Sequence, residues 1–306
     1  IGDQSLSADT KGSRSVAVGY GALNPQNHTS ATDAYNVGIG YTAGNSLSTG
    51  VQNIFVGGQA GDGTDDGSYN VAVGHSSLSA NNGDGNTAIG WSAGFSVTGI
   101  TNTMLGNAAG YAVTSGGNNM CLGYNAGRTG SPGGNITTGS NEIALGDNNI
   151  ASFSCKVSLT ATSDERDKTD FKDLDLGLDF VNALKPVTYV WDDRSNYIDK
   201  TDVTTYDEDG KVTHKGWDLT TDLDNITSDG SKKDDDLQVG FKAQDVIALE
   251  EAAGYKLSDK TNLTATVTKD GKQYGLSYER FVPMLVKALQ ELSAKNDALE
   301  ARIKKL

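Results

Sequence analysis

The sequence predicts a mainly β fold: a trimeric β-solenoid, or β-roll, of short repeats, followed by an α+β domain that ends in a long coiled-coil helix. Three observations predict it. A short motif ending in Gly recurs through residues 1–150, the composition turns from Gly-rich to charged between residues 150 and 163, and leucines recur with heptad spacing in residues 277–306. A repeat of this period is typical of solenoids, and a heptad is typical of coiled coils.

Eight copies of the motif occur in the first half of the chain. Most copies begin with Asn and end four residues later with Gly, as in Asn70–Gly74. The closing glycines are spaced by 16 to 23 residues and lie at positions 19, 40, 57, 74, 90, 106, 123 and 146. In a solenoid, each such unit buries its apolar face only by stacking on its neighbours. We therefore expect residues 1–150 to form a stacked shaft.

Within each motif, larger apolar residues alternate with smaller ones. The first and third residues after the leading Asn are mostly Val, Ile, Leu or Met, as in Val71 and Val73. Alternation with a period of two predicts a short strand, and we expect these larger residues to point into the core. The residue between them would then point outward, where a small side chain lets a neighbouring subunit approach. Small residues at this position are Gly38, Ala72, Ala88, Cys121 and Ala144.

A second signal follows each motif. An Ala-Gly pair such as Ala43-Gly44 predicts a tight corner, because Gly permits a positive φ. Each unit is thus expected to run strand, corner, strand and loop. The leading asparagines should stack as a hydrogen-bonded ladder rather than form a ligand site. They are Asn36, Asn53, Asn70, Asn86, Asn102 and Asn119.

Composition and charge argue against several functions. The net charge of −14 disfavours a nucleic-acid partner, which needs a basic surface. No apolar run reaches the roughly 18–20 residues of a spanning helix, so no membrane insertion is expected. The histidines are isolated, and Asp-rich loops such as 61–70 lack a complete calcium-ligand spacing, so we expect no metal and no cofactor. The start IGDQSLSADT has neither an initiator Met nor a signal-peptide pattern, and a longer natural chain is expected.

The charged half is predicted to be an α+β domain with an insertion. The segment before Pro186 has helical apolar spacing, and VTYVW at 187–191 is typical of a strand. The acidic span 192–236 is too hydrophilic for a core and is expected to be mobile or to wrap a partner as an arm. VGFKAQDVIALE at 239–250 predicts a strand that passes into a helix, and residues 277–306 predict a final helix.

The final helix carries a coiled-coil seam. The seam residues are spaced alternately by four and three, and they are Leu285, Leu289, Leu292, Asn296, Leu299, Ile303 and Leu306. A single polar residue in such a seam sets register and strand number, so Asn296 is expected to align a trimer. The alternative is that the seam packs on its own domain.

Two parts of the chain resemble known families. The repeats resemble the head repeats of trimeric autotransporter adhesins and similar repeats of phage tail fibres. SDERDK at 163–168, LGLDFVNALKPVTYVW at 176–191, VGFKAQDV at 239–246 and the segment 276–306 resemble the intramolecular chaperone of phage tail spikes, tail fibres and endosialidases, a family of self-cleaving peptidases. The resemblance implies a trimeric C-terminal folding clamp. Further residues that support the motif are Asp164, Arg166, Gly240, Phe241 and Gln244.

The same resemblance implies a catalytic pair at the start of this domain. Ser163 matches the family's nucleophile, Lys168 its general base, and Thr162-Ser163 the bond that is cut. A neutral amine would take the hydroxyl proton while the oxygen attacks a backbone carbonyl, so each chain would act once, on itself, as a serine endopeptidase. Asp167 opposes this, because a neighbouring carboxylate favours the protonated amine. Two alternatives are that Ser163 is only a helix N-cap, or that the clamp is kept while cleavage is lost.

These features predict a repeat shaft or tip at 1–150, a connector at 151–162, a chaperone and autoprotease domain at 163–276 containing the insertion 192–236, and a coiled coil at 277–306. The expected protein is a homotrimeric phage tail fibre or tailspike, assembled in the host cytoplasm and carried in the virion. Its expected partners are the remainder of the tail and a host surface glycan or receptor. Two alternatives are a bacterial-surface trimeric adhesin without protease activity and a glycan-degrading tailspike depolymerase.

Overall fold

The chain forms two compact units in this computed structural model. The structure describes residues 1–305 except 132, 157, 159, 199–200, 207–211 and 219–222. One unit contains Ile1–Ala151 together with Asp193–Ser228, and the other contains Ser152–Asp192 together with Asp229–Leu306.

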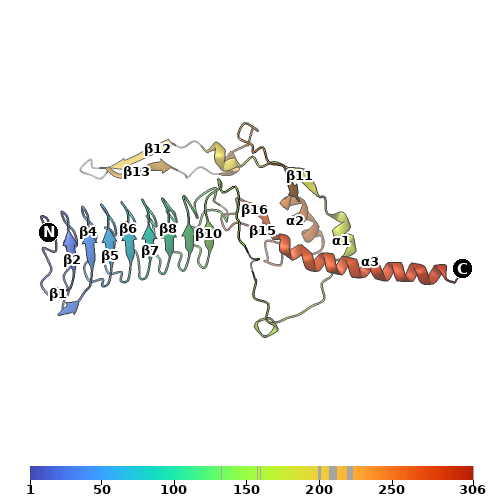
Figure 1. Cartoon of the computed structure of the whole chain (residues 1–306), viewed down its shortest axis with the longest axis horizontal. Coiled ribbons are helices and arrows are strands. Elements are labelled where there is room, and N and C mark those ends of the chain that lie inside the picture. The colour runs from blue at the N-terminus through green and yellow to red at the C-terminus, as the bar shows by residue number, and fades with distance from the viewer. Residues whose placement is uncertain are drawn as a thin grey trace. The chain divides into compact units, whose positions relative to one another are not determined.

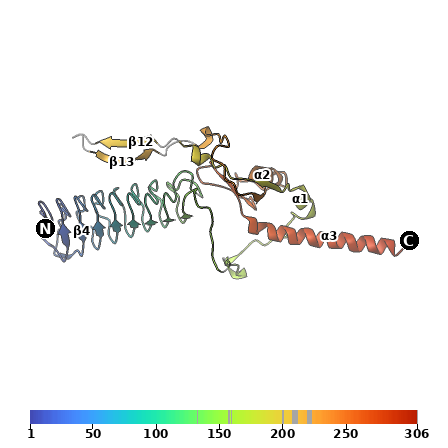
Figure 2. The ribbon, with the colours of Figure 1, turned by 45° about the horizontal axis from the view of Figure 1, so that its top comes forward.

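The repeats form a solenoid with one parallel, eight-stranded sheet whose strands follow each other in chain order (Figure 1). Its strands are β2 (Val16–Val18), β4 (Val37–Ile39), β5 (Ile54–Val56), β6 (Val71–Val73), β7 (Thr87–Ile89), β8 (Thr103–Leu105), β9 (Met120–Leu122) and β10 (Ile143–Leu145). The predicted mainly β solenoid is confirmed. The expected second strand of each unit is wrong, since between these strands the described residues form turns, bends and unassigned backbone, with only the short β3 as an exception. Figure 2 shows the same stack turned by 45°.

The predicted orientation of the strand side chains is reversed in the structure. The middle residue of each strand points inward and is buried, including Ala72, Ala88 and Cys121, whereas the flanking residues, such as Ile54 and Ile89, remain partly exposed. The reason is the narrow interior of each turn, where closely stacked backbone leaves little space for side chains. Middle residues with large side chains need glycine neighbours to fit.

Phe55 illustrates how little space the interior offers. Its ring is fully buried at a position where most units carry a small residue. A Cβ added at Gly44 would lie 2.8 Å from this ring, and one at Gly61 would lie 2.5 Å from it. Both glycines also have a positive φ, which favours Gly in any case. The absence of two side chains therefore makes room for one aromatic ring.

The leading asparagines form the expected ladder, but their partners are mostly backbone groups. Asn36 Oδ1 accepts a hydrogen bond from the backbone N–H of Asn53 at 2.8 Å, and Asn53 Oδ1 accepts one from Asn70 N at 2.9 Å. The Asn53 amide donates to the carbonyl of Gly67 at 2.9 Å. All three asparagines are fully buried, so each bond satisfies a group that water does not reach. The ladder joins each turn to the next.

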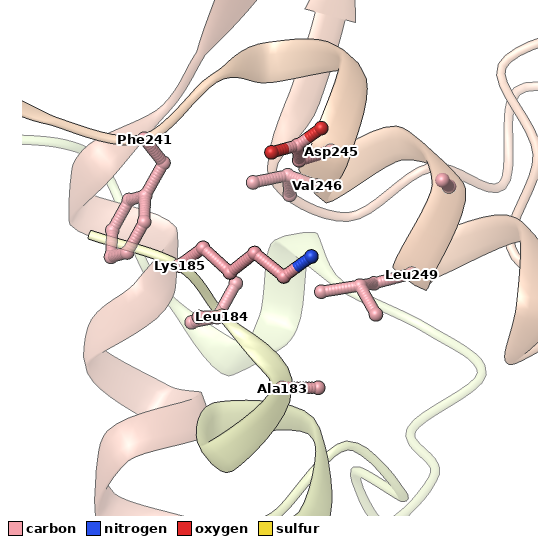
Figure 3. Close-up of a pocket in the computed structure, with 8 residues that line it drawn as sticks. Ala183, Leu184, Lys185, Phe241, Asp245, Val246 and Leu249 are labelled. Atoms are coloured by element: carbon pink, nitrogen blue, oxygen red, sulfur yellow. The ribbon is translucent and has the colours of Figure 1, made fainter. Parts of the chain in front are cut away.

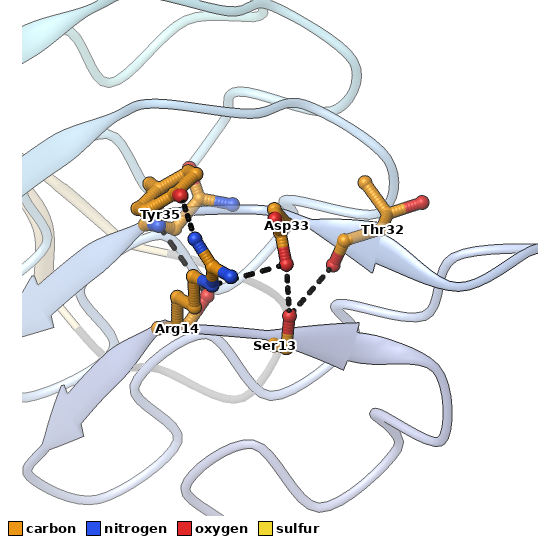
Figure 4. Close-up of polar contacts among 7 residues, drawn as sticks. Ser13, Arg14, Thr32, Asp33 and Tyr35 are labelled. Atoms are coloured by element: carbon orange, nitrogen blue, oxygen red, sulfur yellow. Dashed lines mark hydrogen bonds and ion pairs between the residues drawn. The ribbon is translucent and has the colours of Figure 1, made fainter.

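A small accessory sheet lies near the N-terminal end of the solenoid. It pairs β1 (Gly12–Ser13), which precedes the first strand of the solenoid, in parallel with β3 (Thr32–Asp33), which lies in the longer loop that gives the first two glycines their spacing of 21 residues. Ser13 Oγ donates to Asp33 Oδ1 at 2.7 Å, and Arg14 pairs with the same carboxylate at 3.2 Å (Figure 4). Arg14 also lies over the ring of Tyr35. These contacts hold the extra loop residues together.

The insertion also has local structure. It contains the 3₁₀ helix η2 (Arg194–Tyr197), the antiparallel hairpin of β12 (Thr201–Tyr206) and β13 (Val212–Asp218), and the 3₁₀ helix η3 (Leu223–Asn225). Ser195, Ile198 and Leu223 are buried. The prediction that this span is too hydrophilic for any core is therefore wrong at its two ends, where these scattered residues contribute to the solenoid unit.

The second unit is a small α+β assembly. Its elements are η1 (Glu165–Asp167), α1 (Leu178–Ala183), β11 (Val187–Tyr189), β14 (Gln238–Gly240), α2 (Ala243–Ala252), β15 (Ala265–Val267), β16 (Tyr274–Leu276), η4 (Tyr278–Arg280) and α3 (Phe281–Ile303). Two antiparallel pairs form its sheets, β11 with β14 and β15 with β16. Its buried core consists of Leu176, Phe180, Val246, Phe281 and Met284. The predicted helix before Pro186, the strand after it and the final helix are confirmed.

Candidate functional site

The segment that precedes Lys168 folds into the short 3₁₀ helix η1. Its N-cap is Asp164, whose carboxylate accepts from the backbone N–H of Arg166 at 2.9 Å and pairs with the Arg166 guanidinium at 2.6 Å. The interpretation of Ser163 as the N-cap is therefore wrong by one residue. The Arg166 contacts lower the pKa of Asp164, and the carboxylate in turn raises the pKa of Arg166.

The turn of η1 brings Lys168 back to Ser163. Lys168 Nζ donates a hydrogen bond to Ser163 Oγ at 2.5 Å, and both residues are exposed. Among the described residues, no carboxylate lies within ion-pair distance of Lys168, and this includes Asp167. The two groups thus lie within the distance needed for proton transfer between a hydroxyl and an amine. Their catalytic roles stay predictions.

The backbone around this pair is exposed in the part of the chain that the structure describes. The described residues from Ala151 to Asp173, Thr162 among them, are exposed except for Asp164, which is partly buried. A general base works as the neutral amine, and burial is one cause that favours this form. Any burial of the pair must therefore come from outside this segment.

The other predicted motif residues lie at the junction of β14 and α2. Gly240 is buried, and a Cβ there would collide with the hydroxyl of Tyr278. The same hydroxyl accepts a hydrogen bond from the backbone N–H of Phe241 at 3.1 Å, and the Phe241 ring stacks on Phe281 with centroids 5.4 Å apart. Gln244 is exposed in the first turn of α2. Gly240 and Phe241 therefore join α2 to the start of α3.

Sequence reasoning missed Tyr278 and Phe281, although they contact the predicted motif residues. Their role depends on a contact across nearly forty residues of sequence, between Phe241 and Tyr278. The only signal available was a cluster of aromatic residues just before the final helix.

A shallow groove lies beside this junction (Figure 3). It runs between the end of α1, at Ala183–Lys185, and α2, and Phe241 closes one side. Lys185 and Asp245 are its charged lining residues. Neither Ser163 nor Lys168 lines the groove, so it is separate from the predicted cleavage pair.

Helix α3 presents two apolar faces. Phe281, Met284 and Ala288 are buried in the core of its own unit. The seam residues face away from this core and are half or more exposed: Leu285 50%, Leu289 66%, Leu292 51%, Leu299 54% and Ile303 68%. Asn296 is exposed as well, and Leu306 lies outside the described residues. The alternative that the seam packs on its own domain is therefore wrong.

The solenoid also presents an apolar face. Outward-facing residues of seven of the eight strands leave large hydrophobic side chains at the surface of one parallel sheet. We call this set the strand face, and it comprises Val16, Ile39, Ile54, Ile89, Leu105, Met120, Ile143 and Leu145, each exposed by 38% or more. A contiguous apolar surface of this kind marks an interaction site.

The described residues offer neither a candidate metal site nor a candidate membrane-spanning helix. In the part of the chain that is described, no group of three or more His, Cys, Asp and Glu side chains is placed to hold a metal ion. Likewise, none of the described helices combines the length and the hydrophobicity that crossing a bilayer requires.

Comparison with known proteins concerns the second unit. No curated protein and no solved structure matches the chain. Residues 163–255 match the family model of peptidase S74, described as chaperone of endosialidase, and the match begins at Ser163. Residues 163–255, which follow the solenoid in sequence, are therefore similar to the intramolecular chaperones of the peptidase S74 family.

Proposed function

We propose that this protein is a homotrimeric phage tail fibre or tailspike component whose C-terminal domain directs trimer folding and is then released from its covalent link to the repeats by autocatalytic cleavage at Thr162-Ser163. One observation carries the proposal: the family match begins at Ser163, the residue whose hydroxyl accepts a hydrogen bond from Lys168. The protein would assemble in the host cytoplasm and join the remainder of the tail in the virion.

The strand face supports the trimer. Its eight large side chains lie on one sheet and point away from the interior of the turns. The middle residues of the strands occupy that interior. In a trimer the three strand faces meet at a common axis, so each chain supplies apolar cover for the others. We still expect the strands to contact neighbouring subunits, but through the large residues of the strand face instead of the small middle residues.

Helix α3 supports the same symmetry at the other end of the chain. Its own core takes Phe281, Met284 and Ala288, which leaves the seam free for partner helices. Coiled-coil seams bury such residues by knobs-into-holes packing. The helices of three chains would thus set the register before the shafts pair.

A folding aid is physically useful for this shaft. The described strands of the solenoid pair with strands of neighbouring units, and the strand face is exposed in the single chain, so cover for it would come from other chains. Pairing of separate chains has no local nucleus and leaves apolar surface exposed while it proceeds, which slows folding and favours aggregation. A helix that aligns three chains shortens this step.

The proposed cleavage uses the chain's own backbone as substrate. Ser163 Oγ attacks the carbonyl carbon of Thr162 while Lys168 takes the hydroxyl proton, and the Ser163 nitrogen leaves as an amine that regains a proton. The resulting ester is hydrolysed by water, which gives a Thr162 carboxylate. Attack within one chain benefits from proximity rather than affinity.

The exposed state of the pair suggests when cleavage occurs. In the single chain neither Ser163 nor Lys168 is covered, and this leaves Lys168 without the burial that favours a neutral amine. Packing of the connector between assembled chains would supply such cover. Cutting would then follow folding, which makes the mature shaft kinetically trapped, because its alignment device is no longer covalently linked to it.

The repeat part would contribute to host attachment. Exposed aromatic residues follow the closing glycines of several units, and Tyr20 stacks on Tyr41 with centroids 5.6 Å apart. Trp91 and Tyr124 are exposed at the equivalent position. Aromatic faces beside polar groups suit the mixed surface of a sugar. Calorimetry with host surface polysaccharide should show weaker binding by Trp91→Ala, and equal binding would exclude this residue.

The deciding experiment is a mass measurement of the purified protein. We expect fragments 1–162 and 163–306 from the natural sequence, and a single full-length chain from Ser163→Ala and from Lys168→Met. Ser158→Ala and Lys172→Met are matched controls, because both residues are exposed neighbours outside the pair, and they should be cut normally. Cleavage before residue 163 in Ser163→Ala would refute the dyad.

A further inference from the structure

The fragment that cleavage would detach contains a segment that packs with the shaft. The chain enters the solenoid unit at Asp193 and leaves it after Ser228, although both positions follow the proposed cut. We call residues 193–198 and 223–228 the arm base. We propose that the arm base docks on the last turns of the solenoid and keeps the C-terminal fragment bound to the shaft after Thr162-Ser163 is cut.

The arm base contacts two points of the shaft. Asn148 Nδ2 donates to Asn196 Oδ1 at 2.7 Å. Ser195 packs against the backbone at Gly130, where an added Cβ would lie 2.6 Å from the Ser195 Cβ. Both shaft residues precede the proposed cut, and both arm residues follow it. Cleavage of the backbone therefore leaves these contacts in place.

Internal bonds make the arm base a defined element. Asp193 Oδ1 accepts from Ser195 N at 2.9 Å and from Ser195 Oγ at 2.8 Å, which caps η2. Arg194 links the two halves of the arm base, since its guanidinium donates to the Leu223 carbonyl at 3.0 Å and lies 3.7 Å from the Asp224 carboxylate. These bonds stabilise the arm base independently of its contacts with the shaft.

Ser195 and Leu223 of the arm base are buried. Ser195 is 8% exposed and Leu223 is 2% exposed, although both belong to an acidic, polar insertion. On the shaft side, Ser131 is fully buried and donates to the Gly146 carbonyl at 3.0 Å, within the last and longest unit of the solenoid. Terminal turns of a solenoid need a cap because no further unit covers them. The arm base fits this need.

Retention follows from the number of contacts. In the proposed trimer three arm bases would act together, so the second and third contacts form at a high effective concentration. Retention after self-cleavage rests on the proposed function, whereas docking of the arm base does not. A cut made elsewhere in the connector therefore tests docking by itself.

Two glycines of one loop provide a matched pair of variants. Gly130 and Gly133 have φ values of +87° and +88°, so alanine strains the backbone equally at both positions. Only Gly130 faces Ser195, and a Cβ at Gly133 would meet nothing within 4 Å. A difference between Gly130→Ala and Gly133→Ala therefore reports the arm contact rather than backbone strain.

The experiment uses the full-length chain with Ser163→Ala and a site for a sequence-specific protease placed in the connector 151–162. After the cut, size-exclusion chromatography should show both fragments eluting together for this parent and for Gly133→Ala. The two fragments of Gly130→Ala should separate at a protein concentration at least tenfold higher than that at which the parent's fragments separate. The same is expected, independently, for Asn196→Ala. Hydrogen exchange at residues 195–198 should be faster than in the parent for Gly130→Ala, and unchanged for Gly133→Ala.

The outcomes separate the two proposals. Complete separation of the parent's fragments at micromolar concentration, or equal retention by Gly130→Ala and Asn196→Ala, would overturn docking by the arm base. An uncut natural chain, combined with retained fragments after the engineered cut, would refute self-cleavage and leave docking supported.

Discussion

Polar substitution of the strand face should dissociate the proposed trimer without unfolding the chain. We consider the variant that carries Ile54→Ser, Ile89→Ser and Leu105→Ser, whose side chains are 41%, 39% and 48% exposed in the single chain. Complete burial of an Ile or Leu side chain contributes about 1.5–3 kcal/mol, so the exposed parts correspond to roughly 0.6–1.4 kcal/mol each. For the nine side chains of a trimer the loss is roughly 6–12 kcal/mol, an upper estimate because area-based values overstate burial.

Light scattering after size-exclusion chromatography measures the effect directly. The natural sequence should elute as a trimer at all concentrations tested, and the triple variant should show monomer at low micromolar concentration. Tyr69→Ser with Ile100→Ser is the control, because these side chains are 56% and 54% exposed but lie on the loops, outside the strand face. A triple variant that remains trimeric, with a Tm lowered by less than about 2 °C, would refute the strand face as the trimer contact.

Three further predictions concern single residues. Phe55→Ala removes a fully buried ring and should lower the free energy of unfolding by about 3–5 kcal/mol in chemical denaturation; a loss below about 1 kcal/mol would contradict the packing described. Burial, followed by the nearby Glu142 charge, raises the pKa of the Cys121 thiol to about 12. Alkylation at pH 8 should therefore add one label to the folded protein, at the exposed Cys155, and two labels after unfolding. Two labels on the folded protein would contradict the burial of Cys121. The hydrogen bond from the backbone N–H of Leu178 lowers the pKa of Glu291, so this contact stabilises the fold at neutral pH, and the stabilisation is lost as the pH falls below the ordinary pKa of glutamate. Glu291→Gln should flatten this part of the plot of unfolding free energy against pH. An unchanged plot would exclude the contact as the source of the pH dependence.

The repeat and the chain order of its strands were predictable from sequence, because a period of 16 to 23 residues leaves few arrangements other than stacking. The direction of the side chains was not. Alternation shows that Val71 and Ala72 lie on opposite faces, but not which face is inside. The usual rule that the larger apolar residue is buried fails here, since the interior of a turn is narrow and the outer face is itself apolar.

At the candidate site, the proximity of Ser163 and Lys168 agrees with what the motif predicts. The N-cap of η1 does not, because it is Asp164 and not Ser163. Asp and Ser cap helices about equally well, so sequence could not decide between Asp164 and Ser163. The arm base was hidden for another reason. Ile198 and Leu223 are isolated apolar residues in an acidic span, and no periodicity marks them as buried. They belong to the same compact unit as Ile1–Ala151, which is distant from them in sequence.

The asparagine ladder gives the shaft a fixed unit of length. Every rung joins consecutive turns by the same Asn-to-backbone bond, while the spacing of 16 to 23 residues is absorbed in loops away from the ladder. Loop insertions therefore widen the shaft without stretching it. The addition or loss of one whole unit changes its reach by one strand spacing, about 4.8 Å. Duplication of repeats would thus adjust how far such a shaft extends in small, equal steps.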